Sequence, residues 1–370
     1  MGIRASTGPD REGPSICLMS LAVAFTSFPG TSYNGKFICS KIDPSVEVHT
    51  CRMKVRVLHH DHCFDGLASA AVFSAYVSRK VDPSAEIGYT GLAHAPNQKF
   101  IDDALLDGDI NAIVDFKYSP SPRLTWWFDH HQSAFLAPED EQQFFAGTWA
   151  TKFYDPAYRS CTKFIAEVLA SKFGFQESKL DDLVEWADII DGARYQDAKT
   201  AVELNAPALK MVLVIEATRD KGLINKIIKD MQTRTLEQIM DDEAIQKEFQ
   251  PLYQRHVRTN ELIKNAATCE GGVVFFDLVG HDVEGYSKFI PYYLFPECTY
   301  SVSVSLTPIR TKVSVGFNPW SKQPRRHNLA SICERFNGGG HAVVGAISFR
   351  PDQIELAREA AHEIARELRS

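Results

Sequence analysis

The sequence predicts an α/β protein, in which a parallel sheet is joined by helices to a smaller mixed α/β domain with a cleft between the two. Two observations predict this class. In the first half, short apolar segments that end in Asp or His are separated by stretches long enough for crossover helices, the pattern of a parallel sheet. Beyond residue 269, alternating apolar and polar positions predict the strands of a half-exposed sheet.

Length, composition and charge restrict the class of protein. The 370 residues, 44% of them hydrophobic, suffice for two ordinary domains. The net charge of -7 means that a nucleic acid or polyphosphate must be met by a local basic patch, which argues against duplex DNA as a bulk partner. The eight cysteines form no Cys-x-x-Cys pair, and no apolar run approaches the roughly 20 residues of a membrane span. We therefore expect a cytoplasmic protein with reduced thiols and no membrane partner.

The first part of the chain lacks the pattern of a packed element. Residues 1–52 are rich in Gly, Ser, Pro and Thr and have no sustained period, so we expect a disordered or spuriously translated leader; the apolar run 15–25 would make a poor signal peptide. At Met53 the pattern changes to that of a strand, which makes Met53 the expected functional start. The expected domains are residues 53–200, a helical linker 201–268 and a C-terminal domain 269–370.

A dense group of polar side chains follows the first expected strand, residues 53–60. After this group, Gly66 opens a helix rich in small residues, as in the first half of a βαβ unit. A solvated His-rich turn is the alternative, but so many metal-binding side chains within seven positions favour a site. They are His59, His60, Asp61, His62, Cys63 and Asp65.

Two further apolar segments end in polar residues that bind metals. Beyond a weaker strand around 86–91, residues 110–114 lead into Asp115, and 124–128 lead into an Asp-His-His triplet. Taken singly, Asp115 fits a helix or turn cap, and the triplet fits a polar strand end as well as a site. Because parallel strands end at one edge of a sheet, all three groups would converge there, as a two-metal site requires. The triplet is Asp129, His130 and His131.

The chain resembles the DHH phosphoesterase superfamily, which is named for this triplet. A second signature, NGGGHAVVGAISF at 337–349, is similar to the Gly-Gly-Gly-His segment of the C-terminal substrate-binding domain associated with the family. The resemblance covers about residues 53–350. The superfamily includes single-strand exonucleases, oligoribonucleases, nucleotide phosphatases, cyclic-dinucleotide hydrolases and manganese pyrophosphatases.

The resemblance implies two divalent metal ions, manganese first, with magnesium or cobalt as alternatives. His59 matches the histidine of the first motif, with His60 as the competing choice, and Asp115 matches the carboxylate that bridges both ions. Helical spacing over 178–190 carries Asp191 to the site, with Asp188 as the alternative. The implied metal ligands are His59 or His60, Cys63, Asp65, Asp115, His130 and Asp191.

Within the triplet, the resemblance separates the roles. It makes His130 a metal ligand and His131 the catalytic residue that faces the scissile phosphate, while Asp129 supports both histidines. Cys63 departs from the family, because most members have a carboxylate there. A thiol is a softer ligand that must lose its proton to bind, so the first metal position would be weaker or altered.

In the remainder of the chain, residues 221–267 read as long charged helices that bridge the domains, with a partner-binding helix as the alternative. Strands are expected over 273–279, 300–309 and 311–317, and an amphipathic helix over 351–368.

The expected substrate-binding chemistry of the C-terminal domain is cationic and glycine-rich. Arg325 and Arg326 belong to the one dense cationic stretch and suit phosphate oxygens, although a solvated loop explains them equally well; Trp320 offers a face for a base. Consecutive glycines leave backbone N–H groups open to an anion, and a histidine follows them. This segment is Gly338, Gly339, Gly340 and His341.

The function predicted from these residues and the resemblance is a metal-dependent phosphoesterase. It would hydrolyse phosphodiester or phosphomonoester bonds of short oligonucleotides or nucleotides with metal-activated water. One alternative is an inorganic polyphosphatase or pyrophosphatase of the same fold. Another is a catalytically impaired nucleotide-binding protein, because of Cys63. The possibility of a homodimer is left open.

Overall fold

A computed structural model describes residues 52–370 apart from 96, 97, 282 and 284. The leader expected over 1–52 therefore lies outside the described residues except for Arg52. In the part of the chain that the structure describes, no helix is both long enough and apolar enough to cross a membrane.

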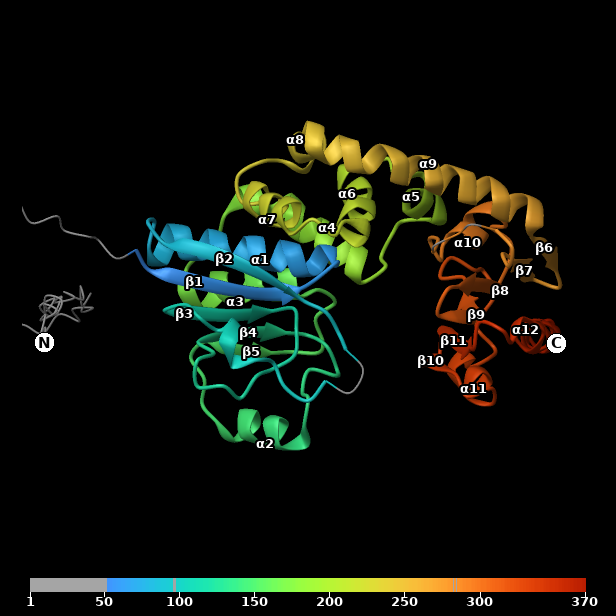
Figure 1. Cartoon of the computed structure of the whole chain (residues 1–370), viewed down its shortest axis with the longest axis horizontal. Helices are drawn as coiled ribbons and strands as arrows, with labels where there is room; N and C mark the ends of the chain where they lie inside the picture. The colour runs from blue at the N-terminus through green and yellow to red at the C-terminus, as the bar shows by residue number, and fades with distance from the viewer. Residues whose placement is uncertain (1–51, 96–97, 282, 284) are drawn as a thin grey trace, which may run out of the picture. The chain divides into compact units, whose positions relative to one another are not determined.

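The first sheet is parallel throughout, as the sequence predicts. Its strand order is β2-β1-β3-β4-β5, so β1 and β3 lie in its interior (Figure 1). The apolar segments form strands because both faces of the sheet are covered; all four residues of β4, for example, are buried. The strands are β1 (Lys54–His60), β2 (Glu86–Leu92), β3 (Ile110–Val114), β4 (Trp126–Asp129) and β5 (Lys152–Tyr154).

Helix α1 (Phe64–Tyr76) lies at the centre of one side of this sheet and is buried along its whole length. Its start passes so close to the end of β1 that a Cβ on Gly66 would lie 2.2 Å from the carbonyl oxygen of His60, which explains the glycine. Four helices pack against α1. They are α3 (Cys161–Phe173), α4 (Asp181–Asp191), α6 (Pro207–Ala217) and α7 (Lys221–Asp230).

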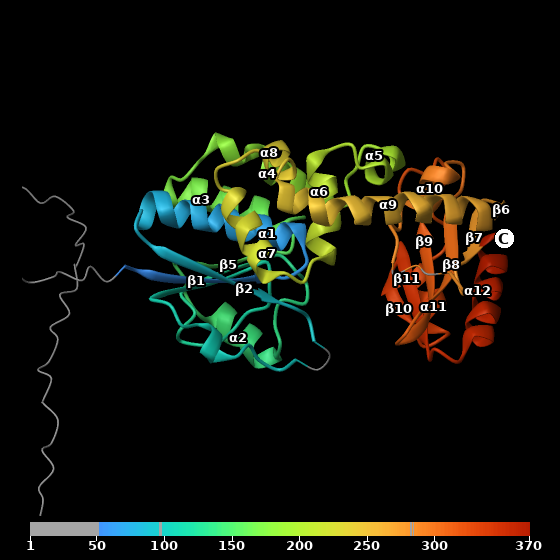
Figure 2. The same ribbon diagram turned by 45° about the horizontal axis from the view of Figure 1, so that its top comes forward.

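Helix α2 (Pro138–Ala146) covers the opposite side of the sheet, as Figures 1 and 2 show. It contributes Phe144 to an aromatic cluster, in which the ring of Trp127 lies 4.8 Å from that of Tyr118 and 5.0 Å from that of Phe144. Neither α2 nor the three-residue edge strand β5 is among the elements expected from the sequence.

A long helix follows the first sheet and its covering helices. Helix α9 (Glu243–Ala266) contacts α6 near its beginning and α10 and β7 further along (Figure 2). The charged helices expected over 221–267 are present as α7, α8 (Leu236–Met240) and α9, of which only α9 is long. Two further short helices are α5 (Ala198–Glu203) and α10 (Ile290–Leu294). Single turns lie at Val77–Val81, Asp103–Leu105 and Ser178–Leu180.

The second sheet is mixed, with the order β10-β11-β9-β8-β7-β6. Only β7 and β8 pair in parallel among its described strands, and the expected hairpin is formed by β8 and β9. Helices α11 (Leu329–Glu334) and α12 (Ile354–Leu368) pack against it. The strands are β6 (Thr268–Glu270), β7 (Val273–Asp277), β8 (Tyr300–Thr307), β9 (Arg310–Phe317), β10 (Gly339–His341) and β11 (Val344–Phe349).

Candidate metal centre

The carboxyl ends of three parallel strands bring most of the expected metal-binding residues together. β1 ends at His60, Asp115 directly follows β3, and β4 ends at Asp129. Because β1, β3 and β4 are parallel neighbours, these ends meet at one edge of the sheet. The first turn of α1 adds Asp65, and the last residue of α4 adds Asp191.

Asp115 lies at the centre of this arrangement and is almost completely buried. One of its carboxylate oxygens lies 3.4 Å from His60 Nδ1, and the other lies 3.3 Å from His130 Nε2. Two sets of possible ligand atoms, each within 4.8 Å of one another, share this residue. One set is His60, Asp115 and His131; the other is Asp65, Asp115 and His130. Asp115 therefore has the position of a carboxylate that bridges two ions.

The backbone at Asp115 adopts a left-handed conformation, with φ of 56°, which is uncommon outside glycine. Its N–H donates to the carbonyl oxygen of Phe128 on the neighbouring strand at 2.9 Å. This hydrogen bond holds the turn at the point where β3 ends. Aspartate tolerates this left-handed conformation better than most residues. The conformation occurs at the residue whose carboxylate lies between His60 and His130.

His130 directs one ring nitrogen at the carboxylates. Its Nδ1 lies 3.1 Å from the carbonyl oxygen of Tyr158, which can only accept, so Nδ1 carries a proton. Nε2 lies 3.3 Å from Asp115, 3.6 Å from Asp191 and 3.7 Å from Asp65. A metal ligand is usually oriented in this way by a hydrogen bond from its second nitrogen.

Asp129 holds the rest of the triplet in place. Its Oδ1 accepts hydrogen bonds from the backbone N–H groups of His130 and His131, at 2.8 and 3.2 Å, and from Nδ1 of His131 at 2.7 Å. In the neutral imidazole, the proton on Nδ1 leaves Nε2 of His131 with a free lone pair. Burial lowers the pKa of this imidazole, but the Asp129 carboxylate outweighs burial and raises it. The supporting role expected of Asp129 agrees with this geometry.

The alternation of side chains along β1 separates the two candidate histidines, since successive residues point to opposite faces. His60 contacts Asp115, whereas Nδ1 of His59 lies 3.0 Å from the carbonyl oxygen of His60. His59 is completely buried, and its Nε2 has no hydrogen-bond partner. The metal-binding sets include His60 and not His59 among the described residues.

Asp65 has two functions in the fold. Its carboxylate accepts hydrogen bonds from the N–H groups of Cys161 and Thr162, at 2.6 and 3.0 Å, and so caps the start of α3. The same carboxylate lies 3.7 Å from His130. Burial and the charges of Asp115 and Asp191 raise the pKa of Asp65 well above its ordinary range.

The choice between Asp188 and Asp191 depends on what faces each carboxylate. The carboxylate of Asp188 forms ion pairs with Arg194 at 2.5 Å and with Lys163 at 3.7 Å. These two cations balance its negative charge, so Asp188 has no need of a metal ion. Asp191 lies 3.6 Å from His130. Burial, followed by the charge of Asp115, raises the pKa of Asp191 to about 6.

The chemistry of the site fits divalent cations. Several of its buried polar atoms have no hydrogen-bond partner, which is costly unless an ion or water supplies one. Burial lowers the pKa of His130, but Asp115, Asp65 and Asp191 outweigh this effect and raise it to about 10. In the metal-free protein, the proton on His130 offsets part of the negative charge of the three carboxylates. Divalent ions would offset the same negative charge. The unpartnered atoms are His60 Nδ1, His130 Nε2, both oxygens of Asp115 and Asp129 Oδ2.

Comparison with solved structures decides the fold. The chain is similar to the pGpG-specific phosphodiesterase PggH from Vibrio cholerae, with a TM-score of 0.62 over 86% of this chain and 100% of that chain, at 15% identity. It is also similar to a DHH domain from a family of ribosomal proteins, with a TM-score of 0.50 over 86% of this chain and 88% of that chain, at 15% identity. The chain has the DHH fold. Neither the protein-family models nor the curated proteins include a match.

Cys63 immediately precedes α1 within this DHH fold, and its thiol makes no capping hydrogen bond to that helix. Burial, then the charges of Asp115 and Asp65, raise the pKa of the thiol well above its usual range. Among the described residues, Cys63 belongs to neither metal-binding set. An added cation would have to displace a tightly held proton before this sulfur could bind it.

His94 is a residue of the site that sequence reasoning missed. It lies in the loop after β2, and its ring stacks on Phe116 at 4.7 Å and lies 4.8 Å from that of His60. Burial and the neighbouring His60 lower the pKa of His94, which favours a neutral imidazole. Its one sequence signal is its place after a weak strand, at the same sheet edge as the other polar residues.

The three glycines of the C-terminal segment differ in whether a side chain would fit at their positions. A Cβ on Gly338 would lie 2.4 Å from the carbonyl oxygen of Ala346, and one on Gly340 would lie 2.2 Å from that of Val344. These two glycines therefore allow β11 to approach closely. Gly339 has open space where its Cβ would be, and the side chain of His341 is exposed.

The side chains of the cationic stretch are partly occupied by contacts within the fold. Arg325 Nη1 donates to the carbonyl oxygens of His327 and Ala342, at 2.8 and 3.1 Å, and so ties its loop to the segment after β10. The side chain of Arg326 is exposed. Trp320 donates its indole N–H to Tyr195 at 3.1 Å and packs edge-on against Phe289, so this ring has a structural contact of its own.

Proposed function

We propose that this protein is a metal-dependent phosphoesterase that hydrolyses phosphodiester or phosphomonoester bonds of short oligonucleotides or nucleotides. The observation that carries the proposal is the pair of ligand sets that share Asp115. Two ions joined by one carboxylate suit the displacement of an oxygen from phosphorus. The DHH fold, and its similarity to a protein named as a pGpG-specific phosphodiesterase, support the same reaction class.

The proposed ions are held by His60, Asp65, Asp115 and His130, and Asp191 lies beside His130. His131 completes the set of His60 and Asp115 and also lies at the substrate side of the site. Carboxylate and imidazole ligands suit manganese, with magnesium and cobalt as alternatives. When bound, such ions lower the pKa of water and stabilise negative charge on phosphoryl oxygens. The residues themselves orient these groups: Asp129 fixes the tautomer of His131, and Tyr158 fixes that of His130.

His131 is the proposed catalytic residue that faces the phosphate. Its ring is about one-third exposed, whereas that of His130 is nearly buried, so a substrate reaches His131 more easily. Arg326, Gly339 and His341 are the proposed contacts for the remainder of the substrate, because each is open to solvent or sterically free. Gly338, Gly340 and Arg325 shape that segment through their contacts with β11 and the neighbouring loop.

The test is hydrolysis of a substrate panel with manganese, magnesium or cobalt. The panel contains a dinucleotide, a short RNA, a short DNA, a nucleoside 3′,5′-bisphosphate and inorganic polyphosphate. We expect turnover of at least one nucleotide substrate by the full chain, and loss of that turnover in Asp115→Ala and Asp191→Ala. Asp188→Ala is the matched control on the same helix and should retain most activity, because Asp188 faces Arg194.

Three results would contradict the proposal. Full activity of Asp115→Ala would show that the shared carboxylate is not needed. Absence of bound metal in the purified protein, together with nucleotide binding without turnover, would favour the impaired nucleotide-binding protein. Turnover of polyphosphate alone would favour the polyphosphatase.

A further inference from the structure

A large cavity lies on the face of the second sheet that α11 and α12 do not cover. Its volume is about 1170 Å³, which accommodates a nucleotide-sized ligand. Alternate residues of β8 and β9, such as Val302 and Val313, pack with these helices in a hydrophobic core. Since successive side chains of a strand point to opposite faces, the residues between them face the cavity. The cavity and the packed core therefore occupy opposite sides of one sheet.

Small and polar side chains form the floor of this cavity. They lie opposite one another across β8 and β9, and their size leaves open the space that large apolar residues fill in a packed sheet face. The cross-strand pairs are Ser301 with Gly316, Ser303 with Ser314 and Ser305 with Lys312. A ligand can therefore approach the sheet closely along this floor.

The two ends of the floor differ in how their polar groups are used. The hydroxyl oxygen of Tyr292 lies 2.9 Å from Ser301 Oγ, and that of Tyr286 lies 2.5 Å from Ser303 Oγ, so both serines are satisfied within the protein. At the other end, neither the hydroxyl of Ser305 nor the ammonium of Lys312 has a hydrogen-bond or ion-pair partner among the described residues. This second end keeps its donors available for a ligand.

The described lining of the cavity is cationic, whereas the chain as a whole has a net charge of -7. Its described residues include Arg310, Lys312 and two further cations, and neither Asp nor Glu. Burial, followed by the charge of Arg310, lowers the pKa of the half-buried Lys312. An anion bound beside both cations would reduce their repulsion and the cost of burying the ammonium group.

Strand register brings the free donors together. Arg310 lies two positions before Lys312 and so on the same face of β9, while Ser305 lies directly opposite Lys312, a separation of about 5 Å between Cβ atoms. Arg310 Nη1 donates to Ser348 Oγ at 3.2 Å, and Ser348 pairs with Lys312 from β11. Because a guanidinium has five N–H groups, most of those of Arg310 stay free. One anion can therefore contact all three donors.

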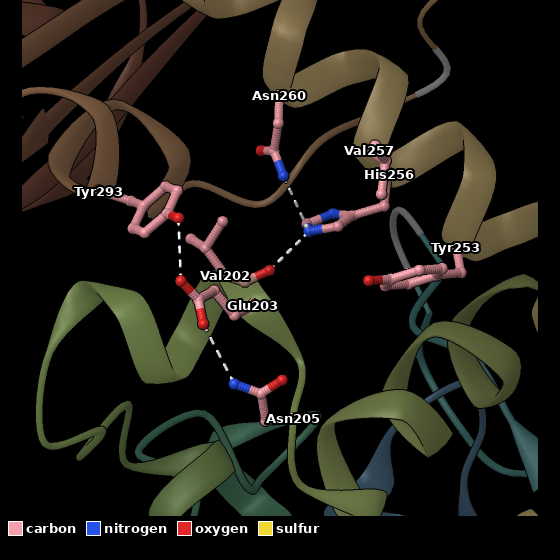
Figure 3. A pocket seen from close by; sticks show the side chains of 8 residues that line it. All are labelled: Val202, Glu203, Asn205, Tyr253, His256, Val257, Asn260 and Tyr293. Atoms are coloured by element: carbon pink, nitrogen blue, oxygen red, sulfur yellow. Dashed lines mark hydrogen bonds between the residues drawn. The ribbon is translucent and has the colours of Figure 1, made fainter.

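The charged group of a smaller pocket, between α5, α9 and α10, is in a different situation. Figure 3 shows that Tyr293 and Asn205 point at Glu203, to whose carboxylate they donate at 3.0 and 3.1 Å. Glu203 therefore has partners within the protein, which Lys312 lacks among the described residues. Of the two pockets, the cavity on the sheet has the stronger requirement for a ligand of opposite charge.

We propose that the Lys312 end of the cavity binds the terminal phosphate of a nucleotide-sized ligand and holds it without cleaving it. A phosphate monoester carries a charge of about −1.5 to −2 at neutral pH, which matches two cations, whereas a carboxylate carries a single charge. Arg310 and Lys312 donate to the phosphoryl oxygens, and Ser305 adds a hydroxyl donor. The rest of the ligand lies along the floor, beside apolar side chains such as Phe276 and Leu306. The site goes beyond the proposed phosphoesterase activity and does not depend on it, because it shares no residue with the metal centre.

Titration calorimetry of the full chain with adenosine 5′-monophosphate tests the proposal in the presence of a chelator, which prevents metal-dependent hydrolysis. We expect this nucleotide to bind and adenosine, which lacks the phosphate, to bind at least about 10-fold more weakly. Lys312→Gln and Arg310→Gln should each weaken binding of the nucleotide by about 10-fold, the loss expected for one hydrogen bond to a charged group. Lys264→Gln, which changes an exposed lysine of α9, is the matched control and should bind the nucleotide as the unmodified protein does.

Further variants keep the test decisive. Ser305→Ala removes the hydroxyl donor and should weaken binding of the nucleotide by about 3-fold or more, so it replaces Lys312→Gln if that variant fails to fold. Asp115→Ala should bind the nucleotide normally, which separates this site from the metal centre and from the proposed hydrolysis. Four results would each overturn the proposal: equal binding of the nucleotide and adenosine, unchanged binding by folded Lys312→Gln and Ser305→Ala, loss of binding in folded Asp115→Ala, or no binding of the nucleotide at millimolar concentration.

Discussion

Nδ1 of His131 lies 2.7 Å from Oδ1 of Asp129, and the same oxygen also accepts the backbone N–H groups of His130 and His131. A single carboxylate oxygen thus fixes the position of the turn and the tautomer of the imidazole.

Replacement of Asp129 by Asn should disturb this tautomer while preserving the shape of the side chain. An amide can present either an acceptor or a donor to Nδ1, so the proton on His131 is no longer held there. We expect kcat to fall by about 10- to 100-fold, as is typical when the partner of a functional histidine is lost. Initial rates on the best substrate of the panel measure this. An unchanged kcat would contradict the assigned role.

The pKa of His130 predicts how the stability of the metal-free protein depends on pH. Because its folded-state pKa is raised from 6.5 to about 10, its contribution to stability is complete below pH 6.5 and is lost as the pH approaches 10. In the presence of a chelator, His130→Gln should therefore lose more stability relative to the unmodified protein at pH 6.5 than at pH 9.5. Urea unfolding of both proteins at these two pH values measures the difference. The same difference at both pH values would be inconsistent with a proton held on His130.

Cys63→Asp would restore the carboxylate that the resemblance leads us to expect. Without metal, another buried carboxylate near Asp65 and Asp115 adds repulsion, so the melting temperature in a chelator should fall. With manganese the added charge strengthens binding, so the rise in melting temperature on adding the ion should exceed that of the unmodified protein. Cys63→Ser is the control for removal of the thiol. A smaller rise in Cys63→Asp than in the unmodified protein would argue against a place for residue 63 beside the ions.

Gly339 and Gly340 should respond differently to substitution by Ala. At Gly340, where φ is 150°, a Cβ would meet the carbonyl oxygen of Val344 at 2.2 Å, and we expect Gly340→Ala to lower the free energy of unfolding by about 1–3 kcal/mol. Gly339→Ala has open space and should change it by less than about 0.5 kcal/mol. If the segment contacts substrate, Gly339→Ala raises KM without this loss of stability. Denaturant unfolding of the two variants measures the loss of stability, and KM measures the contact with substrate. Equal stability of the two variants would contradict the steric difference between these glycines.

The sequence predicts those elements of the fold that have a clear pattern of apolar and polar side chains. The interior strands β1, β3 and β4 are apolar and end in polar residues, which indicates both the strands and the edge where the site lies. Strand β5 has three half-buried residues, too few for a period to appear. Helix α2 has one buried residue, Phe144, and so lacks an apolar stripe that could be recognised.

Residue types and spacing predicted the neighbourhood of the site, but three-dimensional contacts were needed to choose among adjacent candidates. His59 and His60 are both compatible with the motif, and only the face of β1 that meets Asp115 separates them. Asp188 and Asp191 are both on α4, and the position of Arg194 distinguishes them. His94 comes from a loop outside every recognised motif, so its place beside His60 emerges only once β2 has paired with β1.

The cap that Asp65 forms on α3 links the metal centre to two specific backbone amides, those of Cys161 and Thr162. An ion that attracts this carboxylate would draw electron density away from both hydrogen bonds. Their proton chemical shifts and hydrogen-exchange rates should therefore follow the occupancy of the site. Two peptide groups within the protein would then act as a spectroscopic gauge of metal loading that requires neither a substrate nor a reaction.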